Sequence, residues 1–180
     1  MLISFFESEP SGWKYHQNVV KEGNRPTLLG LISDTHGLLR PEAIGALQGS
    51  HLIIHAGDIG DIGILARLRS IAPVVAIRGN VDIGPRAADL PETAVAEAGD
   101  VQIYTLHDLN DLDLNPKAAG FDIVVSGHSH RPGQEERNGV LYINPGSAGP
   151  RRFRLPVTVA RLDLNAKPWQ AEFVRLDENT

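Results

Sequence analysis

The chain has 180 residues, of which 42 % are hydrophobic and 22 % charged, with a formal net charge of -5 and no cysteine. This composition is that of a globular protein with one sizeable core, and it excludes a wholly disordered chain. The acidic balance argues against general binding of duplex nucleic acid, and the lack of thiols excludes disulfides and thiolate metal sites. No apolar stretch approaches the length of a membrane span, so we expect no membrane segment and, by default, a cytoplasmic protein.

The first 26 residues show no clear hydrophobic period and contain several Pro and Gly breaks. We therefore predict an N-terminal extension over residues 1–26 and one domain over residues 27–180. An alternative stays open for the apolar start of the extension, Leu2 to Phe6, which could add a strand or pack on a neighbouring surface.

The segment that follows alternates between strand and helix patterns. The run Thr27 to Ile32 is continuously apolar, as expected for a strand covered on both faces. His51 to His55 and Val74 to Ile77 are further strands, and short helices are predicted over residues 41–48 and 64–70. Strand, helix, strand, helix, strand in this spacing indicates parallel strands joined by right-handed crossovers.

The second half of the chain is typical of antiparallel hairpins. Three pairs of runs are joined by turns: 92–98 with 101–107, the two arms of 134–144, and 157–164 with 170–176. Asn138 and Gly139 tolerate the positive φ of a tight hairpin turn. A loop rich in Leu and Asp is predicted to contain a short helix over residues 115–119, before the strand Ile123 to Val125. The pattern favours two mixed sheets packed together, with helices on the outer faces.

Polar side chains follow these strands where each apolar run ends: Asp34, His36, Asp58, Asn80, His107, His128 and His130. The carboxyl ends of parallel strands meet at one rim, where α/β proteins bind their ligands. Asp34 and His36 are two residues apart, so in an extended loop both side chains point the same way. His128 and His130 repeat this spacing, and their imidazoles could face one centre or two centres with the backbone between them. Each residue alone is more typical of a turn or a surface, but their shared position predicts a site for two metals.

In this order, DTH, GD, GNVD, a strand-ending His and GHSH resemble the five motifs of the calcineurin-like metallophosphoesterases. The segment INPGSAGPRR after GHSH is similar to the small stand-alone bacterial and archaeal phosphodiesterases of that superfamily. The resemblance covers Leu28 to about Leu164 and implies an α/β fold, a four-layer αββα sandwich of two mixed sheets flanked by helices. It assigns one metal to Asp34, His36, Asp58 and His130. It assigns a second metal to Asp58, Asn80, His107 and His128.

The activity that the resemblance implies is hydrolysis of a small phosphodiester by a hydroxide that bridges the two metals. Asp58, the bridging ligand, Asn80 and His128 are the expected catalytic residues. Manganese is the metal expected from the family, and Fe²⁺, Zn²⁺ or Ni²⁺ suit the oxygen and nitrogen donors as well. The alternative is a non-catalytic interaction scaffold of the same fold, like the small retromer subunit, and the complete ligand set favours the enzyme. A homo-oligomer stays open.

Two residues near the predicted ligands depart from the family pattern. Val81 stands where many relatives have a His after the Asn of the third motif, so a proton donor is missing there. Asp108 replaces the Gly that usually follows the strand-end His, and this exchange predicts a disturbed turn around His107.

The predicted substrate contacts are arginines. Arg78 precedes Gly79 at the end of a strand, and Arg151 opens a cluster with Arg152 and Arg154. Guanidinium groups hold phosphate oxygens through bidentate contacts, which makes Arg78 and Arg151 candidates for binding the substrate. A solvated basic loop explains the cluster equally well.

Overall fold

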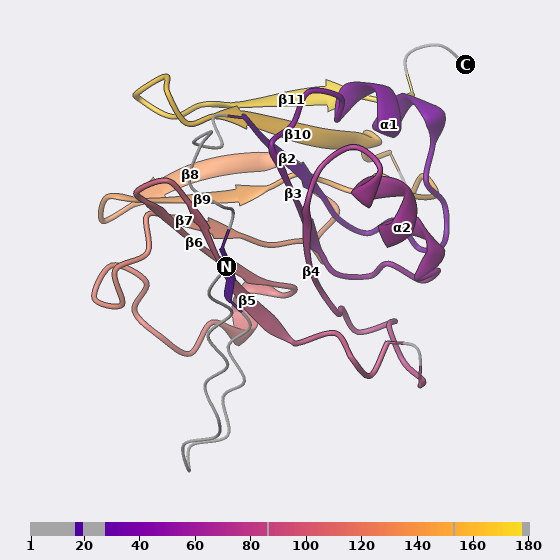
Figure 1. Ribbon diagram of the computed structural model, residues 1–180, viewed down its shortest axis with the longest axis horizontal. Helices are drawn as coiled ribbons and strands as arrows, with labels where there is room; N and C mark the ends of the chain where they lie inside the picture. Colours follow the sequence, from indigo (N-terminus) through magenta and orange to yellow (C-terminus); the bar gives the residue numbers. More distant parts are fainter. Residues whose placement is uncertain (1–16, 20–27, 86, 153, 178–180) are drawn as a thin grey trace.

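The computed structural model describes residues 17–19, 28–85, 87–152 and 154–177. These residues form two β-sheets packed face to face, with two short α-helices outside one of them (Figure 1). Most of the predicted extension, residues 1–16 and 20–26, lies outside the described residues. Within the predicted extension, Gln17–Val19 form β1. This edge strand is parallel to β5, Thr93–Ala98. The domain boundary at residue 26 stays a prediction.

The five-stranded sheet has the strand order β11-β10-β2-β3-β4. Its strands are β2 Leu28–Ile32, β3 Leu52–Ala56, β4 Val74–Ile77, β10 Thr158–Asp163 and β11 Ala171–Arg175. β2, β3 and β4 are parallel and are connected through α1, Pro41–Ala46, and α2, Gly63–Arg69, as the alternating pattern predicts. The closing hairpin, β10 and β11, adds to β2 in antiparallel register. No helix in the described part of the chain is long and apolar enough to cross a membrane.

The six-stranded sheet has the order β1-β5-β6-β7-β9-β8. Its remaining strands are β6 Val101–Leu106, β7 Ile123–Val125, β8 Gly133–Arg137 and β9 Val140–Asn144. The two predicted hairpins are confirmed, because β5 pairs with β6 and β8 with β9 in antiparallel register. Asn138 and Gly139 have φ values of 54° and 73°, which a tight hairpin turn requires. β6, β7 and β9 are parallel and end at the same side.

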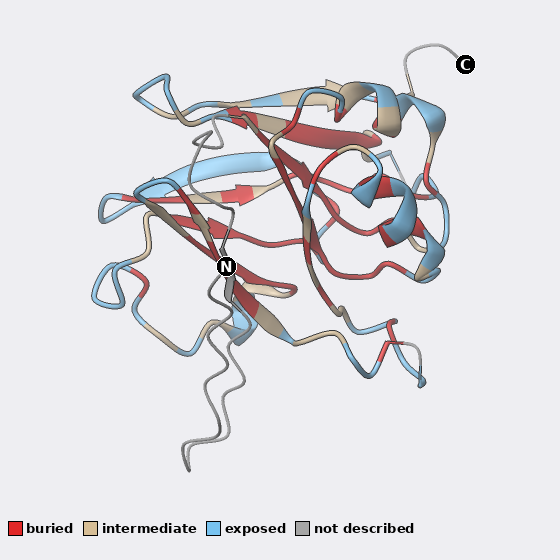
Figure 2. Ribbon diagram, in the orientation of Figure 1, coloured by how far each residue is buried: buried red, intermediate tan, exposed pale blue. Residues whose placement is uncertain are grey.

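Apolar layers cover both faces of the five-stranded sheet, which explains the continuous apolar runs of its central strands (Figure 2). Leu29 and Leu31 of β2 lie in the core between the sheets, together with Ile103 of the opposite sheet. Ile32 points the other way and packs with Leu47 in the layer beneath the helices. Burial on both faces fixes the register of β2, because a slip by one residue would exchange its two layers.

A loop, rather than an α-helix, covers the outer face of the six-stranded sheet within the described residues. Tyr104 and Leu106 pack there against loop side chains: Leu109, Leu112, Leu114 and Phe121. The helix predicted over residues 115–119 is wrong, since this segment is a single hydrogen-bonded turn that ends at Gly120, with φ 84°. The helical element of the loop is instead the 3-10 turn η1, Leu109–Asp111.

Candidate metal centre

The seven predicted ligands lie in loops at the carboxyl ends of five strands. Asp34 and His36 follow β2, Asp58 follows β3 and Asn80 follows β4, while the other sheet contributes His107 after β6 and His128 and His130 after β7. Each of the seven has a side-chain nitrogen or oxygen within 4.0 Å of another member of the set. The structure therefore brings all seven residues together at one rim of the sandwich.

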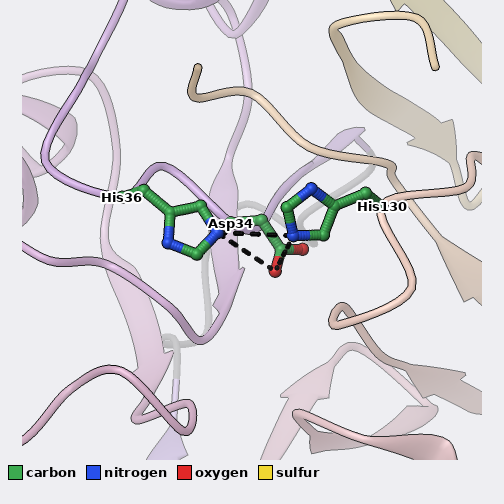
Figure 3. Close-up of side chains that lie close together, drawn as sticks. All are labelled: Asp34, His36 and His130. Atoms are coloured by element: carbon green, nitrogen blue, oxygen red, sulfur yellow. Dashed lines mark hydrogen bonds and ion pairs between the residues drawn. The ribbon is translucent and has the colours of Figure 1, made fainter. Parts of the chain in front are cut away.

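The first donor group consists of Asp34, His36 and His130 (Figure 3). Nε2 of His130 lies 3.3 Å from Oδ1 of Asp34, and Nε2 of His36 lies 4.0 Å from the same oxygen. The two imidazole nitrogens are 3.3 Å apart. One carboxylate oxygen and two imidazole nitrogens thus point at a common centre from two different sheets.

The second donor group consists of Asp58, Asn80, His107 and His128. Nε2 of His107 lies 3.4 Å from Oδ2 of Asp58 and 3.1 Å from Oδ1 of Asn80. Nδ1 of His128 approaches the same amide oxygen to 3.2 Å. Oδ2 of Asp58 also lies 3.8 Å from Nε2 of His36, so this carboxylate reaches both donor groups.

The donor atoms fit divalent cations. Oδ1 of Asp34 is fully buried and accepts no hydrogen bond within the described structure, which is costly for a carboxylate oxygen unless a cation neutralises it. The imidazole nitrogens of His36 and His130 face each other, an arrangement in which each can donate a lone pair to a common ion. Mixed imidazole, carboxylate and amide donors suit Mn²⁺, Fe²⁺, Zn²⁺ and Ni²⁺.

Five of the seven candidate ligands adopt positive φ values, which non-glycine residues rarely do: Asp34 52°, His36 45°, Asp58 55°, His128 66° and His130 57°. The extended loops assumed from the two-residue spacing are therefore wrong. The left-handed backbone brings Asp34 and His36 together, whereas His128 and His130 face different donor groups. Residues in this region cost about 1 kcal/mol or more each and persist where tertiary contacts hold them, often at functional sites.

Backbone hydrogen bonds between neighbouring loops hold these strained positions. The N–H groups of Asp34 and His36 donate to the carbonyl oxygens of Gly57 and Asp58 at 3.0 and 2.9 Å. A Cβ at Gly79 would overlap the backbone nitrogen and Oδ1 of Asp58, so only glycine allows the loop after β4 to lie this close.

Asp82 is a structural residue of the centre that the sequence analysis missed. Its buried carboxylate accepts hydrogen bonds from the N–H groups of Ile59, Gly60 and Gly79, at 3.0, 2.8 and 2.8 Å. These bonds tie the loop that carries Asp58 to the loop that carries Asn80. The signal was its place in GNVD, two residues after Asn80.

Asp58 and His107 form a buried charge pair. Burial raises the pKa of the Asp58 carboxyl, but His107, the N–H of Val81 and His36 outweigh that effect and hold the pKa below its usual range. Burial lowers the pKa of His107, whereas the Asp58 carboxylate and the carbonyl oxygen of Ala56 raise it, to about 8. A proton and a metal ion therefore compete for the same imidazole nitrogen.

Of the predicted arginines, Arg78 is the one that the structure places at the edge of this centre. Arg78 lines a cleft of about 500 Å³ together with Asn80, and its guanidinium pairs with Glu92. Arg151 is exposed, and its Nη1 lies 3.6 Å from Oδ2 of Asp177. Burial lowers the pKa of His36, the carboxylate of Asp58 opposes that shift, and the charge of Arg152 adds to it.

The turn around His107 is undisturbed by Asp108. Asp108 has φ -101° and ψ 121°, an ordinary extended conformation that any residue adopts. Nδ1 of His107 lies 2.8 Å from the carbonyl oxygen of Ala56, and this contact fixes the imidazole against β3. The predicted disturbance is therefore wrong, since this position does not require glycine.

The model of the calcineurin-like phosphoesterase superfamily domain matches residues 28–167. The chain belongs to this superfamily. A probable metallophosphoesterase of Methanocaldococcus jannaschii is 34 % identical to it over 165 residues, which cover 84 % of this chain and 82 % of that protein. Phosphoester hydrolysis is the activity that the superfamily supports, and divalent metal ions are the cofactors that it implies.

Solved structures of other proteins share the fold. An archaeal phosphodiesterase superposes with a TM-score of 0.68 at 25 % identity, covering 82 % of this chain and 99 % of its own. Vps29 of Chaetomium thermophilum superposes with a TM-score of 0.67 at 20 % identity, covering 82 % and 97 %. The predicted family and the layered α/β sandwich are confirmed.

Proposed function

We propose that this protein is a divalent-metal-dependent phosphodiesterase that hydrolyses a small phosphodiester at the rim formed by the seven donors. The observation that carries the proposal is the position of Asp58, whose Oδ2 lies 3.4 Å from Nε2 of His107 and 3.8 Å from Nε2 of His36. One carboxylate thereby joins two donor groups. The first group with Asp58 would hold one cation and the second group the other, with manganese as the proposed metal.

A pair of divalent cations supplies Lewis acidity, which lowers the pKa of water and neutralises charge on phosphoryl oxygens. The side chains of the protein supply the arrangement of donors around the cations. Asn80 places a neutral oxygen between the nitrogens of His107 and His128. The side chain of His128 is 45 % exposed, so water and a phosphate group can reach this side of the centre. No protein nucleophile is needed for such a hydrolysis.

The charge of the neighbouring cleft supports a diester rather than a monoester. Asp108, Asp111 and Asp113 line it beside His128. A diester has one negative charge at neutral pH and a monoester close to two, so these carboxylates repel the monoester more. The shared fold with an archaeal phosphodiesterase at 25 % identity agrees with this choice. Arg78 is the proposed phosphate contact, and Arg151, already paired with Asp177, stays a weaker candidate beside Arg152.

The test compares two chromogenic substrates with the Mn²⁺-loaded protein. We expect bis-p-nitrophenyl phosphate to be hydrolysed faster than p-nitrophenyl phosphate, and chelation to abolish both reactions. Asp163→Asn, an exposed carboxylate at the end of β10, is the matched control for a variant of Asp58 and should keep full activity. Equal rates with and without chelator would overturn the proposal.

The second candidate function is a non-catalytic interaction scaffold of the same fold. Ile83, 86 % exposed in the loop after β4, is the observation that favours it, because protein interfaces use exposed apolar side chains. Metal binding without hydrolysis of any mono- or diester would make the scaffold the better proposal. A cytoplasmic location and a homo-oligomeric state stay predictions.

A further inference from the structure

Asp108 lies between two donors of the second group. It follows His107 in the chain, and its Oδ2 lies 3.4 Å from Nε2 of His128. Asp108 and His128 also line two clefts, the one of about 500 Å³ that contains Asn80 and another of about 620 Å³ that contains Tyr142. The pair therefore forms part of the wall between the two clefts.

The two ring nitrogens of His128 face different partners. Nδ1 lies 3.2 Å from Oδ1 of Asn80, the oxygen that Nε2 of His107 approaches to 3.1 Å. The rings of His107 and His128 are nearly perpendicular, at 86°. Nδ1 is thus the atom directed to the donor group, and Nε2 is directed to the carboxylate of Asp108. A ligating Nδ1 has no proton, so the proton of a neutral ring sits on Nε2 and faces Asp108.

The carboxylate of Asp108 is itself fixed. Its Oδ1 accepts hydrogen bonds from the backbone N–H and the side-chain Nδ2 of Asn110, both at 3.0 Å, and so caps η1. These two bonds use Oδ1 and leave Oδ2 free to face the imidazole of His128. His128 needs such a partner more than His130 does, because the side chain of His128 is 45 % exposed and that of His130 only 8 %.

We infer that Asp108 is a positioning residue that orients His128 and keeps its proton on Nε2, which leaves Nδ1 available to a metal ion. A carboxylate that accepts the second N–H of a ligating histidine fixes the ring and makes it a stronger ligand. A glycine at this position would have no side chain for this contact. The inference rests on the proposed metal centre and adds to it a residue outside the ligand set.

The experiment measures Mn²⁺ binding by titration calorimetry on the full-length chain after its metal has been removed by dialysis. We expect two sites in the unaltered protein. In Asp108→Asn and Asp108→Gly, one site should weaken about 10- to 100-fold and the other should keep its affinity. Asp113→Asn removes a carboxylate from the same cleft but not the partner of His128, so its effect on either site should be much smaller than that of Asp108→Asn.

A second measurement reads the proton on His128 directly. In the Zn²⁺-loaded protein, long-range ¹H–¹⁵N NMR should show the Nε2–H tautomer of His128, and in Asp108→Asn this resonance should shift or broaden. Asparagine keeps an oxygen that can cap η1, so this variant decides the question even where Asp108→Gly fails to fold.

The results of the Mn²⁺ titrations distinguish failure of the inference from failure of the proposed function. Two Mn²⁺ sites of unaltered affinity in Asp108→Asn would overturn the inference and leave the proposed function standing. Equal weakening in Asp113→Asn would also overturn it, because the effect would then come from the charge of the cleft. Absence of Mn²⁺ binding in the unaltered protein would overturn the proposed function, and the inference with it.

Discussion

The two donor groups differ in how deeply the fold encloses them. In the first group, Asp34 is fully buried and His130 is 6 % exposed. In the second group, Asp58 and His107 are buried as well, but the side chain of His128 is 45 % exposed, and Asn80 is exposed beside a cleft. The enclosed group is part of the packing between the sheets, whereas the open group faces solvent and substrate. We therefore expect loss of the first group to affect stability more, and loss of the second to affect catalysis more.

The enclosed group owes its position to contacts between segments far apart in the chain. The hydroxyl of Ser147 donates to the carbonyl oxygen of Asp34 at 3.0 Å, and the hydroxyl of Ser33, next to Asp34 in the chain, lies 2.8 Å from the carbonyl oxygen of Gly146. In the open group, the exposed residues Asn80 and His128 are held chiefly by the contacts of His128 with Asn80 and Asp108 and by that of Asn80 with His107. Substitutions in one group, or at Asp58, which joins both, separate the contributions of the two groups.

The largest effect is expected from Asp58→Asn, because Asp58 belongs to both groups. Loss of its charge should weaken both cation sites and lower kcat/KM for bis-p-nitrophenyl phosphate by about 10³-fold or more, equal to several kcal/mol of transition-state stabilisation. Steady-state kinetics with elemental analysis of bound metal measures both effects. Retention of near-normal activity would show that the two groups act independently of Asp58.

Removal of metal should destabilise the whole domain. At about 100 times its dissociation constant, one bound cation contributes roughly 2.7 kcal/mol. For a domain of this size that corresponds to roughly 5 to 10 °C in Tm. Differential scanning calorimetry of chelated and Mn²⁺-loaded protein measures the shift, and Asp58→Asn, which affects both groups, should abolish most of it. Identical melting temperatures, with metal content verified, would contradict the convergence of the seven donors on cations.

His128→Ala and His130→Ala separate the two groups. We expect His128→Ala to lose activity but to keep about half of the Mn²⁺-dependent rise in Tm, since the enclosed group stays complete. His130→Ala should also lower the Tm of the metal-free protein, because it opens a space in a buried position. If the two variants behave alike in both measurements, the distinction between an enclosed and an open group is wrong.

His55 is buried next to the loop that carries Asp34 and His36, and it makes the stability of the protein depend on pH. Burial lowers the pKa of His55 to about 4, and its Nε2 lies 3.0 Å from Oγ1 of Thr35. Because the unfolded chain binds this proton more readily, the free energy of unfolding should fall as the pH is lowered from 6.5 to 4, by up to about 1.4 kcal/mol per pH unit. Chemical denaturation across this range should show a smaller slope in His55→Gln. An unchanged slope would exclude His55 as the cause.

The smallest effect is expected from Val81→His on the open side. The N–H of Val81 donates to Oδ1 of Asp58 at 2.9 Å, and the exchange keeps this backbone bond. An imidazole at this partly exposed position adds a proton donor, so turnover of a diester with an alkoxide leaving group should rise by less than about tenfold. Bis-p-nitrophenyl phosphate, whose leaving group needs no proton, is the control and should change little. A fall in turnover at unchanged metal content would contradict this account.

The sequence predicts those parts of the fold that local pattern determines. The apolar runs of β2 and β3 and the turn at Asn138 and Gly139 carry their own signals, because burial on both faces and positive φ select particular residue types. The segment 115–119 is wrongly predicted as a helix, because Asn115 and Pro116 begin a turn there and Gly120 ends it at once. The outer face of the six-stranded sheet is covered by apolar side chains of an irregular loop. These side chains have no regular spacing along the sequence, so the sequence does not predict that they cover the sheet.

For the site, the order of donors along the chain is enough to predict which residues meet. Their left-handed backbone is not predictable in this way, because it is stabilised by bonds between separate loops, such as His36 to Asp58. The same reason hides Asp82, whose three partners lie in two loops. The ligand assignments themselves stay predictions until metal is measured.

The strand order of the five-stranded sheet has a consequence for biosynthesis. β10 lies beside β2, so this sheet is complete only after the ribosome has released nearly the whole chain. A nascent chain that ends after β4 offers mainly oxygen donors from Asp34, Asp58 and Asn80, together with the single imidazole of His36. Oxygen donors alone favour Mg²⁺ and Ca²⁺, and the later imidazoles shift the preference to transition metals. We therefore expect selection among cellular metals to occur after translation, when the second sheet has docked.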